Sequence, residues 1–195
     1  MAIPDGAEVT GESIGDARVS LRALRRSDAS EMAAMNARNR ADIERVSPPQ
    51  ARDIYTEEGE GERIDGILKQ CEQGTRVSWT IRVDGALAGD LDLHGIHRGA
   101  VQEANVGYMV DGAFRGRGVA TAALRLVIAE GFGELGLHRL DAGAMPSNLG
   151  SQRVLEKAGF TRIGVLRRYL FVAGAWQDHV LYEIVGPDFT PGMES

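Results

Sequence analysis

The segment from Val106 to Thr121 constrains the fold more than any other part of the chain. It reads VGYMVDGAFRGRGVAT, an apolar run followed by a glycine-rich turn and then by apolar residues at helical spacing. This pattern predicts a strand that leads through a tight turn into a helix. The first backbone N–H groups of a helix have no intrahelical partner and carry partial positive charge, so they attract anions. With Arg115 and Arg117 beside it, the turn predicts a cradle for a diphosphate.

Two well-known diphosphate motifs fit this segment poorly. A P-loop ends in Gly-Lys-Ser/Thr, whereas this turn ends in Gly-Val-Ala at 118–120. A dinucleotide-binding fingerprint follows the first strand of a parallel unit and has a third glycine where this chain has Thr121. The diphosphate therefore belongs to another class of cofactor, or the turn is a glycine-rich turn that binds no ligand.

Strand and helix signals are mixed along the rest of the chain, without an internal repeat or a low-complexity linker. Apolar runs predict strands at 18–24, 77–83, 86–96, 106–110, 137–144, 160–172 and 176–185. Helical spacing predicts helices at 28–38, 64–73, 118–131 and 151–158, the first of them starting with a capping box of Asp28 and Glu31. Turn signals at 84–85 and 173–174 join neighbouring strands, which favours an α+β fold with a largely antiparallel sheet.

The length of 195 residues predicts a single domain. Residues 1–16 are small, polar and glycine-rich and predict a loose lead-in, while residues 187–195 read as a flexible tail. The core then spans about residues 17–186. Within it, Pro48 and Pro49 exclude a long helix over 39–60.

Composition excludes several classes of function. The net charge of −6 argues against a protein that binds nucleic acid by neutralising phosphates, and it is compatible with a basic partner. The single cysteine, Cys71, excludes an internal disulfide and a cysteine-based zinc cluster. There is no apolar run of about 18 residues and no signal-peptide pattern at the N-terminus, so we expect a cytoplasmic protein without a membrane span or a metal site.

Two motifs resemble one family. Arg115-x-x-Gly118-x-Ala120 resembles the acetyl-coenzyme A loop of the GCN5-related N-acetyltransferase (GNAT) superfamily, which reads Gln/Arg-x-x-Gly-x-Gly/Ala. The blocks NLGS at 148–151 and EKAGF at 156–160 resemble the RimJ/RimL branch, which acetylates the N-termini of ribosomal proteins. The resemblance spans about residues 17–186 and is weakest over 39–75, where acceptor-binding elements lie in the family.

The resemblance implies a GNAT fold, with a mostly antiparallel sheet of about six to seven strands and about four helices, and acetyl-coenzyme A as the cofactor. In this family the strand before the loop is splayed, so the backbone of 108–110 is expected to hold the acetyl carbonyl and pantetheine; an ordinary paired strand is the alternative. The cofactor-binding residues implied in this way are Met109, Val110, Arg115, Gly116, Arg117, Gly118, Val119, Ala120, Thr121, Asn148 and Ser151.

Catalytic roles are implied for Ser151, Tyr108 and Glu103. By resemblance, Ser151 protonates the coenzyme A sulfur; alternatively it packs on a helix face with a satisfied hydroxyl. Tyr108 contributes its backbone to oxyanion stabilisation. Asn148 binds pantetheine, caps the following helix, or does both.

The general base stays open among Glu103, Asp92 and His94, which could equally form a solvated strand face. Asn105 occupies the place where some relatives carry a carboxylate, and His179 is interpreted as structural. An α-amine has a pKa of about 7.8 and a lysine amine one of about 10.4, so an α-amine acceptor needs only a weak base.

The acidic cluster of Glu57, Glu58, Glu60 and Glu62 is either a solvated loop or the border of an acceptor mouth that attracts a basic peptide.

The sequence therefore predicts an acetyl-coenzyme A-dependent N-acetyltransferase. The predicted acceptor is the N-terminal α-amine of a protein such as a ribosomal protein, with direct transfer in a ternary complex and Cys71 as a packed residue that carries no acyl group. The alternatives are an enzyme that acetylates a small amine (a polyamine, amino acid or antibiotic) and a non-catalytic acyl-coenzyme A sensor. We expect a monomer or homodimer with no nucleic-acid or membrane partner.

Overall fold

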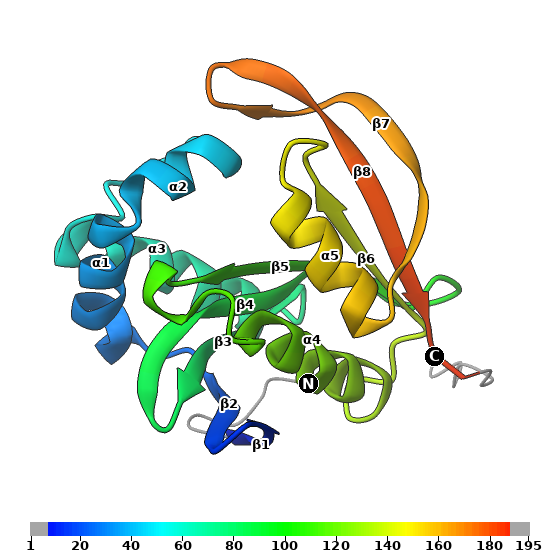
Figure 1. Ribbon diagram of the computed structural model, residues 1–195, viewed down its shortest axis with the longest axis horizontal. Coiled ribbons are helices and arrows are strands. Elements are labelled where there is room, and N and C mark those ends of the chain that lie inside the picture. The colour runs from blue at the N-terminus through cyan, green and yellow to red at the C-terminus, as the bar shows by residue number, and fades with distance from the viewer. Residues whose placement is uncertain (1–7, 188–195) are drawn as a thin grey trace.

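The computed structural model describes residues 8–187, which form one eight-stranded sheet and five α-helices (Figure 1). The strands are β1 Glu8–Ile14, β2 Ala17–Ala23, β3 Arg76–Val83, β4 Ala86–His97, β5 Glu103–Val110, β6 Arg139–Ala144, β7 Thr161–Val172 and β8 Ala175–Val185. The helices are α1 Ala29–Arg38, α2 Arg40–Val46, α3 Glu57–Glu72, α4 Val119–Phe132 and α5 Leu149–Ala158, with short 3-10 turns at Arg26–Asp28 and Gly112–Phe114. The α+β fold is confirmed, and both element counts exceed the prediction by one.

The additional strand is β1, in the stretch that the sequence predicted to be loose. That prediction is wrong for residues 8–14, which pair antiparallel with β2. An edge strand is held by backbone hydrogen bonds and needs few apolar side chains, and here Val9 and Ile14 reach the core. Residues 1–7 of the predicted lead-in and 188–195 of the predicted tail lie outside the described residues.

The sheet has the order β1-β2-β3-β4-β5-β6-β8-β7, and every neighbouring pair is antiparallel except β5 and β6. These two parallel strands pair only over Glu103–Asn105 and Arg139–Asp141. Beyond that point β5 stays with β4 up to Val110, while β6 stays with β8 up to Ala144. The sheet therefore splits between β5 and β6, which confirms that the strand before the glycine-rich turn is splayed.

Helices cover both faces of the sheet (Figure 1). On one face α4 packs on β1, β2, β5 and β6, and α5 packs beside it. On the other face α1 and α3 form a second core with Met32, Met35, Ile64 and Ile67. The main core lies between the sheet and α4, and includes the buried Trp79 and Leu124.

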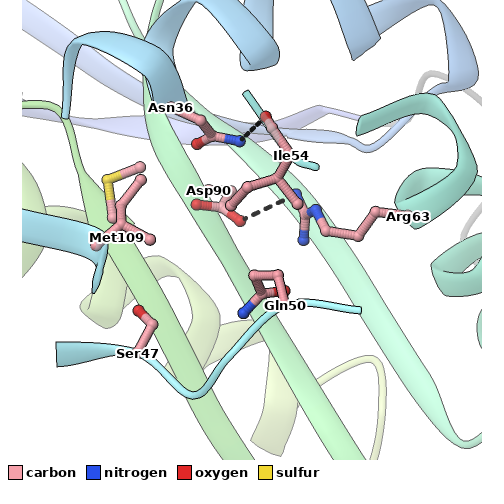
Figure 2. Close-up of a pocket in the computed structure, with 8 residues that line it drawn as sticks. Asn36, Ser47, Gln50, Ile54, Arg63, Asp90 and Met109 are labelled. Atoms are coloured by element: carbon pink, nitrogen blue, oxygen red, sulfur yellow. Dashed lines mark hydrogen bonds and ion pairs between the residues drawn. The ribbon is translucent and has the colours of Figure 1, made fainter. Parts of the chain in front are cut away.

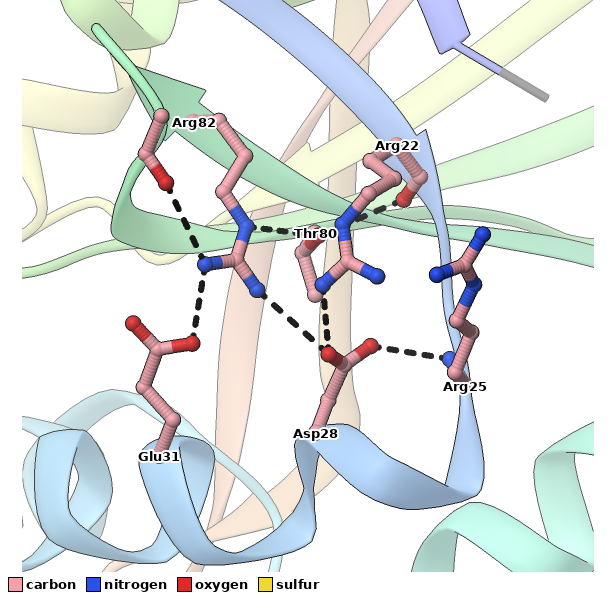
Figure 3. A network of polar contacts seen from close by, with 7 residues as sticks. Arg22, Arg25, Asp28, Glu31, Thr80 and Arg82 are labelled. Atoms are coloured by element: carbon pink, nitrogen blue, oxygen red, sulfur yellow. Dashed lines mark hydrogen bonds and ion pairs between the residues drawn. The ribbon is translucent and has the colours of Figure 1, made fainter. Parts of the chain in front are cut away.

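The start of α1 corrects a local prediction. Asp28 and Glu31 form no capping box, because both carboxylates bind arginines of the sheet (Figure 3). Asp28 is buried and accepts hydrogen bonds from the Arg22 guanidinium at 2.5 Å and from the Arg25 backbone N–H at 2.9 Å. Arg82 lies 3.4 Å from Asp28 and donates to Glu31 at 2.8 Å. This network ties α1 to β2 and β3.

The acidic cluster lies in the first two turns of α3, so the prediction of a loop is wrong, although Glu57, Glu58 and Glu62 are exposed to solvent. None of the four glutamates lines either cavity of the candidate site. Thr56 caps the helix by accepting the Gly59 N–H at 3.2 Å, and acidic side chains in the first turn complement the helix dipole. Glu60 is fully buried and binds Arg63 through two hydrogen bonds of 2.6 and 2.8 Å. Within residues 8–187, no helix is long and apolar enough to cross a membrane.

Candidate functional site

A cleft of about 600 Å³ opens where β5 and β6 separate. It is lined by the end of β5, the glycine-rich turn, the first turn of α4, one side of α5 and part of α2. Every residue predicted to bind the cofactor lines this cleft except Arg117. The predicted residues found there are Met109, Val110, Arg115, Gly116, Gly118, Val119, Ala120, Thr121, Asn148 and Ser151.

The turn before α4 has the backbone shape that exposes N–H groups. Gly116 and Gly118 have φ values of +73° and +86°, in the left-handed region that favours glycine. The Ala122 N–H donates to the Gly118 carbonyl at 3.0 Å and so makes the first intrahelical bond. The three N–H groups before it, at 119–121, have no intrahelical acceptor and point out of the helix start. They lie in the wall of the cleft.

Charge in the cleft is opposite to the charge of the whole chain. Arg45, Arg115, Arg153 and Lys157 line it, and Asp42 is the one acidic residue in its lining. The chain as a whole carries a net charge of −6. A cationic cleft on an acidic protein favours an anionic ligand with more than one charged group.

Arg115 fixes the turn to two neighbouring elements. Its Nε donates to the Val110 carbonyl at 3.1 Å, and its guanidinium forms an ion pair with Asp42 of α2. Hydrogen bonds from Arg115 and Arg45 hold the pKa of Asp42 below its ordinary value. Arg117 instead lies over the Phe114 ring, with its guanidinium carbon 5.7 Å from the ring centroid.

Asp111 anchors the other side of the turn. It is buried, and it accepts hydrogen bonds from Arg38 at 2.8 Å and from the Asn39 amide at 2.9 Å. Burial alone would raise the pKa of Asp111, but the bonds from Arg38 and Asn39 hold it below its ordinary value. The Asn39 side-chain oxygen also accepts the Gly112 N–H at 2.9 Å. The C-terminal end of α1 thus positions the turn.

The splayed end of β5 leaves two N–H groups directed at the cleft. The Asp111 N–H donates to Ala88 of β4 at 2.9 Å. Because successive residues of a strand point their N–H groups in opposite directions, Met109 also faces β4, and Tyr108 and Val110 face the gap toward β6. Since β6 has separated there, these two N–H groups are available to a ligand carbonyl.

Tyr108 and Ser151 meet across the cleft. Their hydroxyl oxygens are 2.8 Å apart, and the Tyr108 hydroxyl also donates to the Ser151 carbonyl at 3.3 Å. Burial raises the pKa of Tyr108 to about 12, so the phenol keeps its proton at neutral pH. Asn148 caps α5 by accepting the Ser151 N–H at 3.1 Å, which confirms the capping interpretation. From the sequence we predicted a role for the Tyr108 backbone only, and the role of its hydroxyl was missed.

The structure does not bring the three predicted bases to the cleft. Glu103 lies at the far end of β5 and faces His97 and Arg139. Asp92 binds Arg76 at 2.6 Å and lies 3.2 Å from His94. None of the three is in the cleft lining, and neither is His179, which is buried in β8 with its ring against Tyr169.

Figure 2 shows a smaller pocket, of about 100 Å³. It adjoins the cleft and shares Ile43 and Met109 with it. Asp90 of β4 lines this pocket, and burial raises the pKa of its carboxyl to about 6. Sequence reasoning missed Asp90. The available signal was its place on the same strand face as Asp92, two residues along.

The cleft fits acetyl-coenzyme A. Free N–H groups and cations suit its phosphates, and the gap between β5 and β6 suits a narrow pantetheine arm. Residues 18–161 match the model of the acetyltransferase (GNAT) domain. The chain belongs to the GNAT acetyltransferase family. This GNAT protein is an N-acetyltransferase that uses acetyl-coenzyme A.

Several GNAT relatives are similar over long stretches. The probable N-acetyltransferase YjcK of Bacillus subtilis is 41% identical over 172 residues, which cover 87% of this chain and 95% of that protein. The ribosomal protein uS5-alanine N-acetyltransferase of Escherichia coli is 32% identical over 106 residues, 54% of this chain and 55% of that protein. The structure of Mycobacterium smegmatis RimJ in complex with CoA-disulfide superposes with a TM-score of 0.83 at 32% identity, covering 86% of this chain and 82% of that one.

Proposed function

We propose that the acceptor of this N-acetyltransferase is the N-terminal α-amine of a protein such as a ribosomal protein. The observation that carries the proposal is the small pocket beside the splayed strand, because it offers an acceptor a separate place next to the cofactor cleft. The similarity to an enzyme that acetylates a ribosomal-protein alanine and to RimJ supports the same class of acceptor.

The two cavities also support direct transfer in a ternary complex. Acetyl-coenzyme A supplies an acetyl group activated as a thioester. In this proposal the N–H groups of Tyr108 and Val110 polarise its carbonyl, and the hydroxyls of Tyr108 and Ser151, 2.8 Å apart, supply a proton to the departing sulfur. Cys71 lines neither cavity, and burial raises its pKa, so it is a poor nucleophile.

The test is a free-thiol release assay with acetyl-coenzyme A and two sets of acceptors. One set contains peptides with free N-termini, and the other contains polyamines, free amino acids and aminoglycosides. We expect kcat/KM to be at least tenfold higher on peptides than on the small amines. Faster turnover on the small amines would contradict the proposed acceptor, and tight cofactor binding without thiol release on either set would favour a sensor.

A further inference from the structure

The pocket around Asp90 has features that the cofactor cleft does not explain. Asp90 and Met109 are direct cross-strand partners, so their side chains lie on the same face of the sheet. That is the face covered by α1 and α3. Tyr108, the next residue on β5, points to the opposite face and meets Ser151 of α5. The pocket and the Tyr108–Ser151 pair therefore lie on opposite sides of the splayed strand.

Asp90 is the one carboxylate that lines this pocket, and within residues 8–187 its one ion-pair partner is Arg63, at long range. Its carboxylate lies 3.8 Å from Arg63, too far for a hydrogen bond. Figure 2 shows the two side chains facing one another across this distance. Arg63 itself makes two shorter bonds with Glu60, at 2.6 and 2.8 Å. The Asp90 carboxylate is therefore available to a ligand.

The charges around the pocket favour a cation. The charged groups that act on Asp90 are Arg63 and Glu60 of α3, Asp92 of β4 and Arg76 of β3. Together with Asp90 they comprise three carboxylates and two guanidinium groups. The remaining lining groups, from α1, α2, β5 and the segment between α2 and α3, are uncharged. The volume of about 100 Å³ accepts a small head group rather than a folded segment.

We propose that this pocket binds the primary ammonium group of the acceptor and that Asp90 is a catalytic residue that takes a proton from its nitrogen. The assignment rests on the proposed acetyl transfer to an N-terminal α-amine. One proton passes from the ammonium to the Asp90 carboxylate, and this transfer frees the nitrogen lone pair. Asp90 then releases the proton to solvent. As the C–N bond forms and the C–S bond breaks, the nitrogen loses a second proton, which balances the one gained by the sulfur.

The pKa of Asp90, raised to about 6 by burial, supports this role. A base is most effective when its pKa is near the working pH. The pKa of the Asp90 carboxyl is closer to the pKa of an α-amine than the pKa of an exposed aspartate is. Glu103, Asp92 and His94 line neither cavity, so with Asp90 as the base none of them is needed in that role.

The experiment compares wild type, Asp90→Asn, Asp90→Glu and Asp65→Asn. Asp65 is an exposed carboxylate of α3 outside both cavities and serves as the matched control. The probe is a hexapeptide with a free N-terminal alanine, beside its N-acetylated form. Calorimetry measures peptide binding to the coenzyme A-loaded protein, and thiol release gives kcat/KM between pH 5 and 9.

We expect Asp90→Asn to lower kcat/KM by about 100-fold, to weaken binding of the free peptide about tenfold and to remove the acidic limb near pH 6. Coenzyme A binding should stay unchanged, Asp90→Glu should recover part of the activity, and Asp65→Asn should match wild type. If wild type acetylates the peptide and Asp90→Asn keeps the same peptide affinity and pH profile, the role assigned to Asp90 is overturned and the proposed acceptor is not. A wild type that acetylates small amines but not the hexapeptide would instead overturn the proposed acceptor, while the binding comparison would still test the pocket.

Discussion

Gly116 and Gly118 set the geometry of the turn that precedes α4. Their positive φ values direct successive N–H groups into the cleft, and a residue with a Cβ adopts this conformation at a cost of about 1 kcal/mol. Sequence reasoning could identify this turn because the requirement is local: the glycines, the arginines and the helix start are adjacent in the chain.

Replacing Gly116 with alanine should therefore separate strain from binding. Gly74, which follows α3, is a matched control, since its φ of +70° is close to the +73° of Gly116 and an added Cβ meets nothing within 4 Å at either site. Both Gly→Ala variants should lose about 1 kcal/mol of stability. Only Gly116→Ala should weaken coenzyme A binding, by about tenfold, in isothermal titration calorimetry. Equal affinities in the two variants would contradict a role for this turn in phosphate binding.

Tyr108 and Ser151 are expected to act as one unit, because their hydroxyls share a hydrogen bond of 2.8 Å. Tyr108→Phe and Ser151→Ala should each lower kcat by about tenfold to 100-fold, and the double variant should lose no more than the worse single variant. The measurement is kcat with saturating peptide at pH 8. With a pKa of about 12, Tyr108 stays protonated, so its ionisation should cause no loss of activity below about pH 11. Additive losses would show that the two hydroxyls act independently.

Asp90 should reduce stability at the pH where it is charged. Burial raises its pKa from 3.8 to about 6, so its contribution to stability is fully present below the unfolded pKa and is lost as the pH rises through about 6. Asp90→Asn should therefore be more stable than wild type at pH 8, by about 1 to 2 kcal/mol, and the difference should shrink toward pH 4. Urea denaturation at both pH values measures this. A variant less stable than wild type at pH 8 would contradict the destabilising effect assigned to this half-buried, weakly paired carboxylate.

At the scale of elements, the sequence predicted most strands and helices because their apolar spacing is a local property. It missed β1, whose pairing to β2 depends on backbone hydrogen bonds, and α2, a short helix that ends at Val46 before the proline pair. It also misassigned Asp28 and Glu31, since their arginine partners are brought in by β2 and β3. Contacts between distant segments are not encoded in local spacing.

The Asp28 network should be important for stability but not for the cofactor cleft. Asp28→Ala leaves Arg22 and the nearly buried Arg82 without their shared carboxylate, so we expect a loss of about 3 kcal/mol in chemical denaturation. Glu31→Ala removes the half-exposed partner of Arg82 and should cost less than about 1 kcal/mol. Coenzyme A affinity of the folded variants should equal that of wild type. A loss for Asp28→Ala as small as that for Glu31→Ala would contradict the network.

At the scale of the whole molecule, the site depends on the split in the sheet. Parallel pairing of β5 and β6 stops at Asn105 and Asp141, and the gap beyond it opens the large cleft, with the small pocket beside it. The sequence predicted most turn residues that line the cleft and, at α5, Ser151 with its cap Asn148, because each set belongs to one local motif. It did not find Asp90, whose place beside Met109 depends on the register of β4 against β5. It also proposed Glu103 as the base, but Glu103 is the first residue of β5 and the cleft lies at the other end of that strand.

The most direct test is a crystal structure of the protein with acetyl-coenzyme A and the N-terminal alanine hexapeptide bound. We expect the diphosphate within about 3 Å of the N–H groups of 116–121, the thioester between β5 and β6, and the peptide nitrogen beside the Asp90 carboxylate. A diphosphate bound elsewhere, or a gap between β5 and β6 that closes on the protein's own side chains, would contradict this expectation.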